Sequence, residues 1–167
     1  MKTRPTGDKI KESLFHYIGP YFDGGNGLDL FAGSGNLGIE ALSRGLSHVI
    51  FVDKQYKAVE TIKDNLKMLK IQDQYEVYRN DAFLALKALS KRQMQFHYVF
   101  LDPPYKKVDF EKLLTQLDSF KLLEKGAKII CEHEKDEKLP QTMENYKIMK
   151  HSCYNSLTCV TIYRYED

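Results

Sequence analysis

The sequence lacks any long apolar run. No stretch approaches the roughly 20 apolar residues that a membrane-spanning helix needs, and the amino end has no apolar core of a signal peptide. It also lacks internal repeats, low-complexity segments and linkers. A chain of 167 residues with 43% hydrophobic content can bury one core. We therefore expect a single cytoplasmic domain covering residues 1–167, with no membrane partner.

Cysteine is scarce, and its spacing matches no common framework. Cys131, Cys153 and Cys159 are odd in number, show no CxxC spacing and fall in predicted strands, so we expect buried, reduced thiols. The run 132–134, Glu-His-Glu, lacks a second His or Cys at ligand spacing, which argues against a metal site there. Ser34 has no identifiable base partner, so a nucleophilic serine is not expected either.

The chain also has no large excess of charge of one sign, because it has 25 basic and 23 acidic side chains and a net charge of +2. The net charge by itself therefore says little about whether the protein binds nucleic acid. The positions of the basic residues along the chain are more informative. Lys2, Arg4, Lys9 and Lys11 gather at the amino end, and Lys106 and Lys107 follow a proline turn. Such lysines could contact phosphates or simply form a solvated surface.

The most informative segment is Asp102-Pro103-Pro104-Tyr105, directly after the apolar run 97–101, which predicts a buried strand. An acid, rigid carbonyls and an aromatic ring are then expected at the rim of the sheet, where open α/β sheets bind ligands. The Asp102 carboxylate and the Pro103 carbonyl could accept the two N–H groups of an exocyclic amine while Tyr105 stacks on its base. Alternatively, the prolines only end the strand.

A glycine-rich loop lies upstream, between a strand predicted at 28–31 and a helix predicted at 37–44. Gly33, Gly35 and Gly38 allow a tight turn and close approach of a ligand to free N–H groups. About twenty residues later a predicted strand ends in Asp53, which could accept hydrogen bonds from ribose hydroxyls. These features predict a nucleotide-cofactor site.

The glycine pattern fits both NAD and S-adenosylmethionine (SAM), so it cannot choose between them. Three acids favour the methyl donor. Asp29 lies ahead of the loop, where it could interact with a cationic aminoacyl group, and the Asp102 clamp has no use in hydride transfer. Asn80 and Asp81 follow the predicted strand 75–79, where a carboxylate could bind an adenine amino group or cap the next helix.

The order of these motifs resembles that of amino-group methyltransferases. More closely, residues 4–15 (RPTGDKIKESLF), 28–35 (LDLFAGSG) and 100–105 (FLDPPY) resemble the RsmD family, over nearly the whole chain. Those enzymes methylate N2 of a guanine in 16S ribosomal RNA, of the position-966 type. The resemblance implies a Rossmann-like SAM-dependent fold: a seven-stranded, mostly parallel sheet with an antiparallel C-terminal strand and helices on both faces.

The resemblance also implies residue roles. Catalysis is assigned to Asp102, Pro103, Pro104 and Tyr105. Donor contacts are assigned to Asp29, Phe31, Ala32, Gly33, Ser34, Gly35, Asp53, Lys54, Asn80, Asp81 and Ala82. Contacts with 16S rRNA, free or within the small ribosomal subunit, are assigned to Arg4, Thr6, Lys9, Lys106, Lys107 and Tyr154. We expect a monomer that uses no metal.

Two departures from the family are visible. Family members usually begin some twenty residues earlier with a β-hairpin, which we expect to be absent, leaving residues 1–20 as a helical lid segment. Near the carboxyl end Tyr154 is followed by Asn155 where the family tends to have glycine; Asn tolerates a left-handed backbone, so a turn can persist. Alternatives are a DNA or RNA adenine-N6 or cytosine-N4 methyltransferase, an NAD-linked oxidoreductase and a non-catalytic RNA-binding relative.

The spacing of apolar residues alternates along the chain between strand-like and helix-like segments. This alternation indicates a largely parallel sheet that is covered by helices on both faces. Helices are predicted at 8–18, 37–44, 56–69, 82–89 and 110–120. Strands are predicted at 28–31, 49–53, 75–79, 97–101 and 127–131, with a closing β-pair at 146–154 and 158–164. The segment 123–126 is predicted to be a turn.

Overall fold

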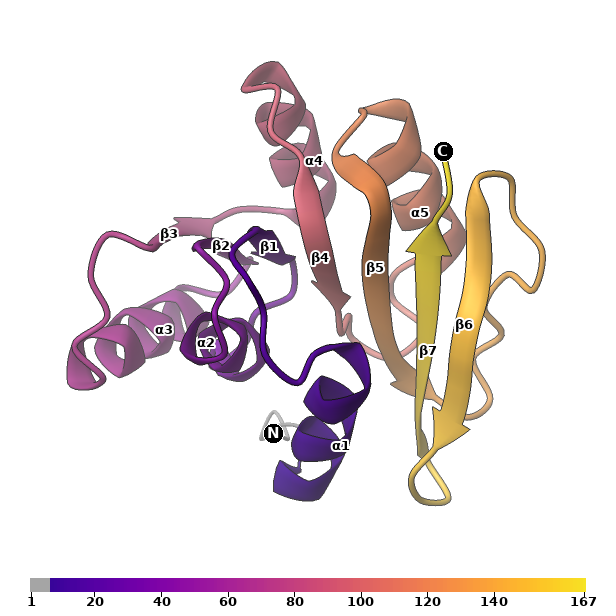
Figure 1. The fold of residues 1–167 in the computed structure, drawn as a ribbon, viewed down its shortest axis with the longest axis horizontal. Helices are drawn as coiled ribbons and strands as arrows, with labels where there is room; N and C mark the ends of the chain where they lie inside the picture. The colour runs from indigo at the N-terminus through magenta and orange to yellow at the C-terminus, as the bar shows by residue number, and fades with distance from the viewer. Residues whose placement is uncertain (1–6) are drawn as a thin grey trace. The chain divides into compact units, whose positions relative to one another are not determined.

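A computed structural model describes residues 7–167 of the chain (Figure 1). The chain forms two compact units, one ending at Ala82 and the other running from Phe83 to Asp167. Within the described residues, no helix combines the length and the apolar character that crossing a bilayer requires. The expectations for Arg4 and Thr6 lie outside the described residues.

The first unit is a three-stranded parallel sheet with its helices. Its elements are α1 (Asp8–Ile18), β1 (Asn26–Asp29), α2 (Asn36–Ser43), β2 (His48–Asp53), α3 (Tyr56–Met68) and β3 (Tyr75–Arg79). The strand order is β3-β2-β1, with Asp29 paired to Phe51 and Asp53 to Arg79. The carboxyl ends of these strands therefore lie at one edge.

Strand β2 forms the centre of this unit. Four of its six residues, Val49, Ile50, Phe51 and Val52, are fully buried, as expected for a parallel strand covered on both faces. Helix α2 packs against β1 and β2, and α3 packs against β2 and β3. Ile62 and Leu66 of α3 are also fully buried, so the 3.6-residue apolar spacing of this helix faces the sheet.

The second unit holds the remaining strands. Its elements are α4 (Ala82–Lys91), which starts at the boundary, β4 (Phe96–Leu101), α5 (Phe110–Ser119), β5 (Leu123–Glu134), β6 (Tyr146–Cys153) and β7 (Thr158–Tyr165). Strands lie side by side in the order β4-β5-β7-β6 (Figure 1). β4 and β5 are parallel, whereas β7 is antiparallel to both neighbours.

Helix α5 contacts β6 and β7, because the hydroxyl groups of Tyr146 and Tyr165 donate to Leu114 and Asp118 of this helix. The Asp109 side chain caps its first turn by accepting from Lys112 N at 3.2 Å, a common start signal. Leu113, Leu114 and Leu117 are fully buried. The Tyr146 hydroxyl on β6 donates to the Leu114 carbonyl at 2.6 Å, which joins the helix to the sheet through a buried hydrogen bond.

Predicted and observed elements agree in type, and the predicted α/β class with seven strands and an antiparallel C-terminal strand is confirmed. One prediction is wrong. Residues 123–126 are the start of β5 rather than a turn, because Leu123 pairs with Phe96 while Lys128 pairs with Tyr98. The extra residues form a bulge, in which Gly126 adopts a positive φ of 83° that favours glycine.

Candidate functional site

The glycine loop joins β1 to α2 in a tight turn. Gly35 N donates to the Ala32 carbonyl at 2.8 Å, and Gly33 and Gly35 have φ of 57° and 82°. A Cβ on Gly33 would meet nothing within 4 Å, so there is open space beside this backbone. The loop is thus both bent and accessible, as a ligand cradle requires.

Asp53, at the end of β2, is held by two backbone donors. Gly33 N donates to Asp53 Oδ2 at 2.9 Å, and Gln55 N donates to Oδ1 at 2.8 Å. Each carboxylate oxygen keeps a second lone pair for another donor. The carboxylate is therefore fixed beside the glycine loop, as predicted from its spacing.

Asp29 lies beneath the loop and is only 3% exposed. Its Oδ2 accepts from Gly38 N, in the first turn of α2, at 3.0 Å. Burial raises the pKa of this carboxyl from 3.8 to about 7; the Gly38 hydrogen bond opposes this rise and the charge of Asp53 adds to it. Asp29 thus connects the end of β1 to the start of α2.

The remaining predicted donor residues follow the same edge. Asn80 N donates to the Asp53 carbonyl at 3.0 Å, and the Asn80 side chain accepts from Asp81 N at 2.8 Å. The Ser34 carbonyl accepts from Asn65 Nδ2 at 3.0 Å. Phe31 is half-buried, Ala32 and Ala82 are buried, and Lys54 is exposed.

These residues fit an adenosyl donor. Acidic side chains end or follow three adjacent parallel strands, with Asp29 on β1, Asp53 on β2 and Asp81 after β3. A ribose diol and an adenine amine are donors that suit the Asp53 and Asp81 carboxylates, whereas Asp29 is buried beneath the loop. The open space at Gly33 would accept the body of the ligand.

In the second unit, the proline turn follows β4 directly. Asp102 comes one residue after Leu101, the last residue of β4, and it is half-buried. Pro103 is buried, Pro104 is exposed, and the Pro104 carbonyl accepts from Lys107 N at 3.2 Å. The turn therefore presents the acid at the carboxyl end of a buried strand, as predicted.

Tyr105 takes part in a small ionic cluster. The residue is 41% exposed, and its hydroxyl donates to Asp136 Oδ2 at 2.5 Å. Lys106 Nζ lies 3.3 Å from the same oxygen and 5.1 Å from the centre of the Tyr105 ring. The hydrogen bond with Asp136 raises the pKa of Tyr105, and the same bond lowers the pKa of Asp136.

The sequence did not predict Asp136 or Glu137 as site residues. Glu137 accepts from Lys106 N at 3.1 Å and from Glu134 N at 3.0 Å, so it connects the proline turn to the end of β5. A pocket of about 580 Å³ lies beside this turn. It is lined by Lys106, Val108, Asp109, Phe110, Glu111, Asp136, Glu137, Lys138, Leu139 and Pro140.

The other predicted substrate residues are divided between the two units. Lys9 is exposed on α1 in the first unit, and Lys107 is exposed after the proline turn. Tyr154 is half-buried and its N–H donates to the Thr158 carbonyl at 2.9 Å. The turn persists, but not through a left-handed Asn155: its Oδ1 accepts from Leu157 N at 2.8 Å and from Thr158 N at 2.7 Å.

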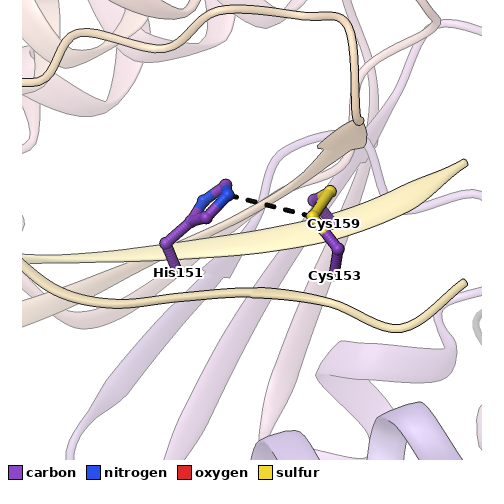
Figure 2. A group of neighbouring side chains, drawn as sticks. All are labelled: His151, Cys153 and Cys159. Atoms are coloured by element: carbon purple, nitrogen blue, oxygen red, sulfur yellow. Dashed lines mark hydrogen bonds between the residues drawn. A yellow bond between two sulfur atoms is a disulfide. The ribbon is translucent and has the colours of Figure 1, made fainter. Parts of the chain in front are cut away.

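The cysteine prediction is partly wrong. Cys131 is a buried free thiol as expected, but Cys153 and Cys159 form a disulfide, and Cys153 is exposed (Figure 2). The reason is the register of β6 and β7, in which these two residues lie directly opposite each other. Sequence periodicity predicted both strands but not this alignment.

The chain is similar to several known proteins. The family model described as "Conserved hypothetical protein 95" matches residues 1–164. The Bacillus subtilis protein named "Putative rRNA methyltransferase YlbH" is 53% identical over 162 residues, which cover 97% of this chain and 88% of that protein. "Ribosomal RNA small subunit methyltransferase D" of Haemophilus influenzae is 38% identical over 147 residues, covering 88% and 76%.

Solved structures agree. A "conserved hypothetical protein" of Streptococcus pyogenes has a TM-score of 0.88 at 38% identity, covering 94% of this chain and 96% of that one. The structure named "SMU.776, a putative methyltransferase complexed with SAH" has a TM-score of 0.75 at 15% identity, covering 93% and 48%, and so shares the fold alone. The predicted Rossmann-like methyltransferase fold is confirmed. The chain therefore belongs to the family described as "Conserved hypothetical protein 95", the RsmD-like family that its motifs resemble.

Proposed function

We propose that this protein transfers a methyl group from SAM to the exocyclic N2 of a guanine in 16S rRNA. The observation that carries the proposal is the position of Asp102, one residue beyond the end of β4, in a chain of the RsmD-like family. The names of its relatives, which include rRNA methyltransferases at 53% and 38% identity, support the substrate class.

The first unit would hold the donor. Asp53 is fixed by Gly33 N and Gln55 N and would accept from the ribose hydroxyls with its remaining lone pairs. Asp81 would accept from the adenine amino group. Asp29 would act mainly by holding the start of α2 through Gly38, since it is buried. When bound, SAM supplies a methyl group already activated by its sulfonium charge, so no metal or covalent intermediate is needed for transfer.

The second unit would hold the acceptor. An exocyclic amine is a weak nucleophile because its lone pair is delocalised into the ring. Asp102 and the Pro103 carbonyl would each accept one N–H, which favours a tetrahedral nitrogen with its lone pair free for in-line attack. The new N–C bond would form as the S–C bond of the donor breaks, with S-adenosylhomocysteine as the other product, and Asp102 would take up the proton that the nitrogen loses. Proline fixes φ and so orients that carbonyl in advance. Tyr105 would stack on the base, with its ring held by the Asp136 hydrogen bond.

The rRNA backbone would be contacted by basic residues beside the turn. Lys107 is exposed, whereas Lys106 already pairs with Asp136 at 3.3 Å. A lysine beside a phosphate adds affinity that falls with salt without specifying sequence. Lys107 is therefore the better candidate for a phosphate contact, and Lys106 would orient Tyr105 and Asp136.

Replacing Asp102 tests the proposed clamp. Asp102→Ala should leave SAM affinity within a few-fold, measured by calorimetry, and lower methyl transfer to rRNA by about two orders of magnitude or more, because the interaction acts in the transition state. Asp73→Asn is a matched control, since Asp73 is an exposed loop residue with a φ of 62° that Asn tolerates. Unchanged turnover in Asp102→Ala would refute the role of the clamp.

The substrate is tested separately. Labelled SAM would be incubated with naked DNA, naked 16S rRNA and assembled small subunits, and the modified nucleotide would be identified by mass spectrometry. Methyl-N2-guanine in the RNA supports the proposal. Labelled DNA, or N6-methyladenine or N4-methylcytosine, would support the other amino-methyltransferases. A thermal shift with NAD but not SAM would indicate an oxidoreductase, and RNA binding without transfer would indicate a non-catalytic relative.

A further inference from the structure

Three potential metal ligands meet at the end of the β6–β7 pair. His151 and Cys153 are two residues apart on β6 and so lie on the same face, and Cys159 lies opposite Cys153 on β7. The ligand atoms of all three side chains lie within 4.8 Å of one another. Figure 2 shows the His151 ring directed at the two sulfur atoms. This cluster plays no part in the proposed methyl transfer.

One of the three spacings between these atoms already matches a tetrahedral metal site. With Zn–S of about 2.3 Å and Zn–N of about 2.0–2.1 Å, tetrahedral geometry places sulfur and nitrogen about 3.6 Å apart and two sulfurs about 3.8 Å apart. His151 Nε2 already lies 3.8 Å from Cys153 Sγ. The sulfurs of Cys153 and Cys159, which are bonded to each other, would have to separate. Rotation of the two side chains in the opened disulfide would allow this.

A chain of hydrogen bonds from His133 through Thr161 to His151 determines which ring nitrogen of His151 can bind a metal. His133 Nδ1 lies 2.9 Å from the Glu134 carbonyl, which only accepts, so this nitrogen carries the proton. In the neutral ring Nε2 is then an acceptor, and the Thr161 hydroxyl, 2.8 Å away, donates to it. Thr161 Oγ1 in turn accepts from His151 Nδ1 at 2.8 Å. The lone pair of His151 is therefore on Nε2, facing Cys153.

The surroundings resemble those of a supported ligand. A metal-bound histidine commonly donates its other ring N–H to a second protein group, which fixes the ring and raises its basicity. Here Thr161 is that group; it is 2% exposed and sits on the paired strand β7. The stacked ring of His133, 5.8 Å from His151, further restricts the His151 ring. His151 and Cys153 are exposed, so an ion can enter from solvent.

We propose that, once the Cys153–Cys159 disulfide is reduced, His151 Nε2 and the two cysteine sulfurs bind one Zn²⁺ ion. Solvent would complete the fourth position. A phosphine with one water molecule gives two electrons and two protons to the disulfide, which yields two thiols and the phosphine oxide. Metal binding then releases both thiol protons as the thiolates coordinate. The disulfide and the zinc site are thus alternative states of the same two residues, and the expectation of a protein without metal would not hold for the reduced form.

Cobalt binding tests this proposal directly. Protein reduced with a phosphine under anaerobic conditions would be titrated with Co²⁺ and then with Zn²⁺. One equivalent of Co²⁺ should give thiolate-to-cobalt charge-transfer and tetrahedral d–d absorption, both removed by Zn²⁺. The same protein with its disulfide intact should give neither signal, and it serves as a control that needs no substitution. Reduced protein without charge-transfer absorption would overturn the proposal.

Variants assign the ligands. Cys153→Ser, Cys159→Ser and His151→Ala should each weaken Co²⁺ binding by about 100-fold or more, and Thr161→Val by about 10–100-fold, as for loss of a group that orients a ligand. Cys131→Ala and His16→Ala should retain the signal, because neither residue belongs to the cluster. A signal that survives both serine substitutions, or that depends on Cys131, would contradict the assignment. Circular dichroism of each variant separates lost ligation from lost folding.

Discussion

The backbone N–H of Gly38 donates to the buried carboxylate of Asp29 at 3.0 Å, which ties the first turn of α2 to the end of β1. Burial raises the pKa of Asp29 to about 7, far above its ordinary value of 3.8. The folded protein therefore binds this proton more tightly than the unfolded chain does. The contribution of this group to the free energy of unfolding consequently falls as pH rises from about 4 to about 7, and is lost above that range.

The first prediction concerns Asp29→Asn. An amide oxygen can still accept from Gly38 N but carries no charge, so the variant should lack this pH dependence. Between pH 5 and pH 8 the wild-type protein should lose about 3 kcal/mol of stability relative to Asp29→Asn. Urea unfolding at both pH values measures the difference. Parallel pH profiles for the two proteins would show that Asp29 does not titrate in this range.

Asp29→Ala leaves the Gly38 N–H without this acceptor. This substitution should lower the free energy of unfolding by about 1–3 kcal/mol.

The second prediction concerns the close approach of α2 to β2 at Gly38. A Cβ there would lie 2.4 Å from Cε1 of Phe51, which is fully buried. Gly38→Ala should therefore destabilise the protein by about 1–3 kcal/mol through overpacking, measured by thermal or urea unfolding. Adding Phe51→Leu should recover part of the loss. Gly7→Ala is the control, because its new Cβ meets nothing within 4 Å. Equal effects at both glycines would contradict the packing argument.

The third prediction separates the two parts of Tyr105. If the ring stacks on the base, Tyr105→Phe should keep methyl transfer within a few-fold, while Tyr105→Ala should lose the stacking energy of about 1–3 kcal/mol, which is roughly 5- to 150-fold in rate. In the proposed site the hydroxyl, which donates to Asp136 Oδ2, would only hold the ring in place. Steady-state transfer of labelled methyl to rRNA measures both variants. Similar activity in all three proteins would argue against a stacking role.

The fourth prediction concerns rRNA binding. Lys107→Ala should weaken binding of rRNA and reduce the slope of log affinity against log salt by about 0.7, the value for one contact with single-stranded nucleic acid. Lys125→Ala is the matched control. This lysine is also exposed, but it lies near the start of β5 and not beside the proline turn. Filter binding at several salt concentrations measures the slopes. A slope that changes equally in both variants would indicate only a general charge effect.

Local sequence signals predicted the elements well. Helix α1 (Asp8–Ile18) and strand β3 (Tyr75–Arg79) have the predicted limits, because apolar spacing and turn residues act over a few neighbours. Asp53 and Asp102 were placed at strand ends for the same reason. Strand β5 was predicted too short at both ends, because only its pairing with β4 and β7 shows that Leu123 and Glu134 belong to it.

By itself the sequence determined the α/β pattern, the glycine loop and the acid-proline turn, since each is written in residues close together along the chain. Only the tertiary structure decided that Tyr105 contacts Asp136, 31 residues away, and that Cys153 faces Cys159. Periodicity gives the face of a strand but not its alignment with a partner, and a shift of one residue between β6 and β7 would move Cys153 away from Cys159. Strand register therefore decided the cysteine pair, whereas the path of the turns after β4 and β5 decided that Tyr105 meets Asp136.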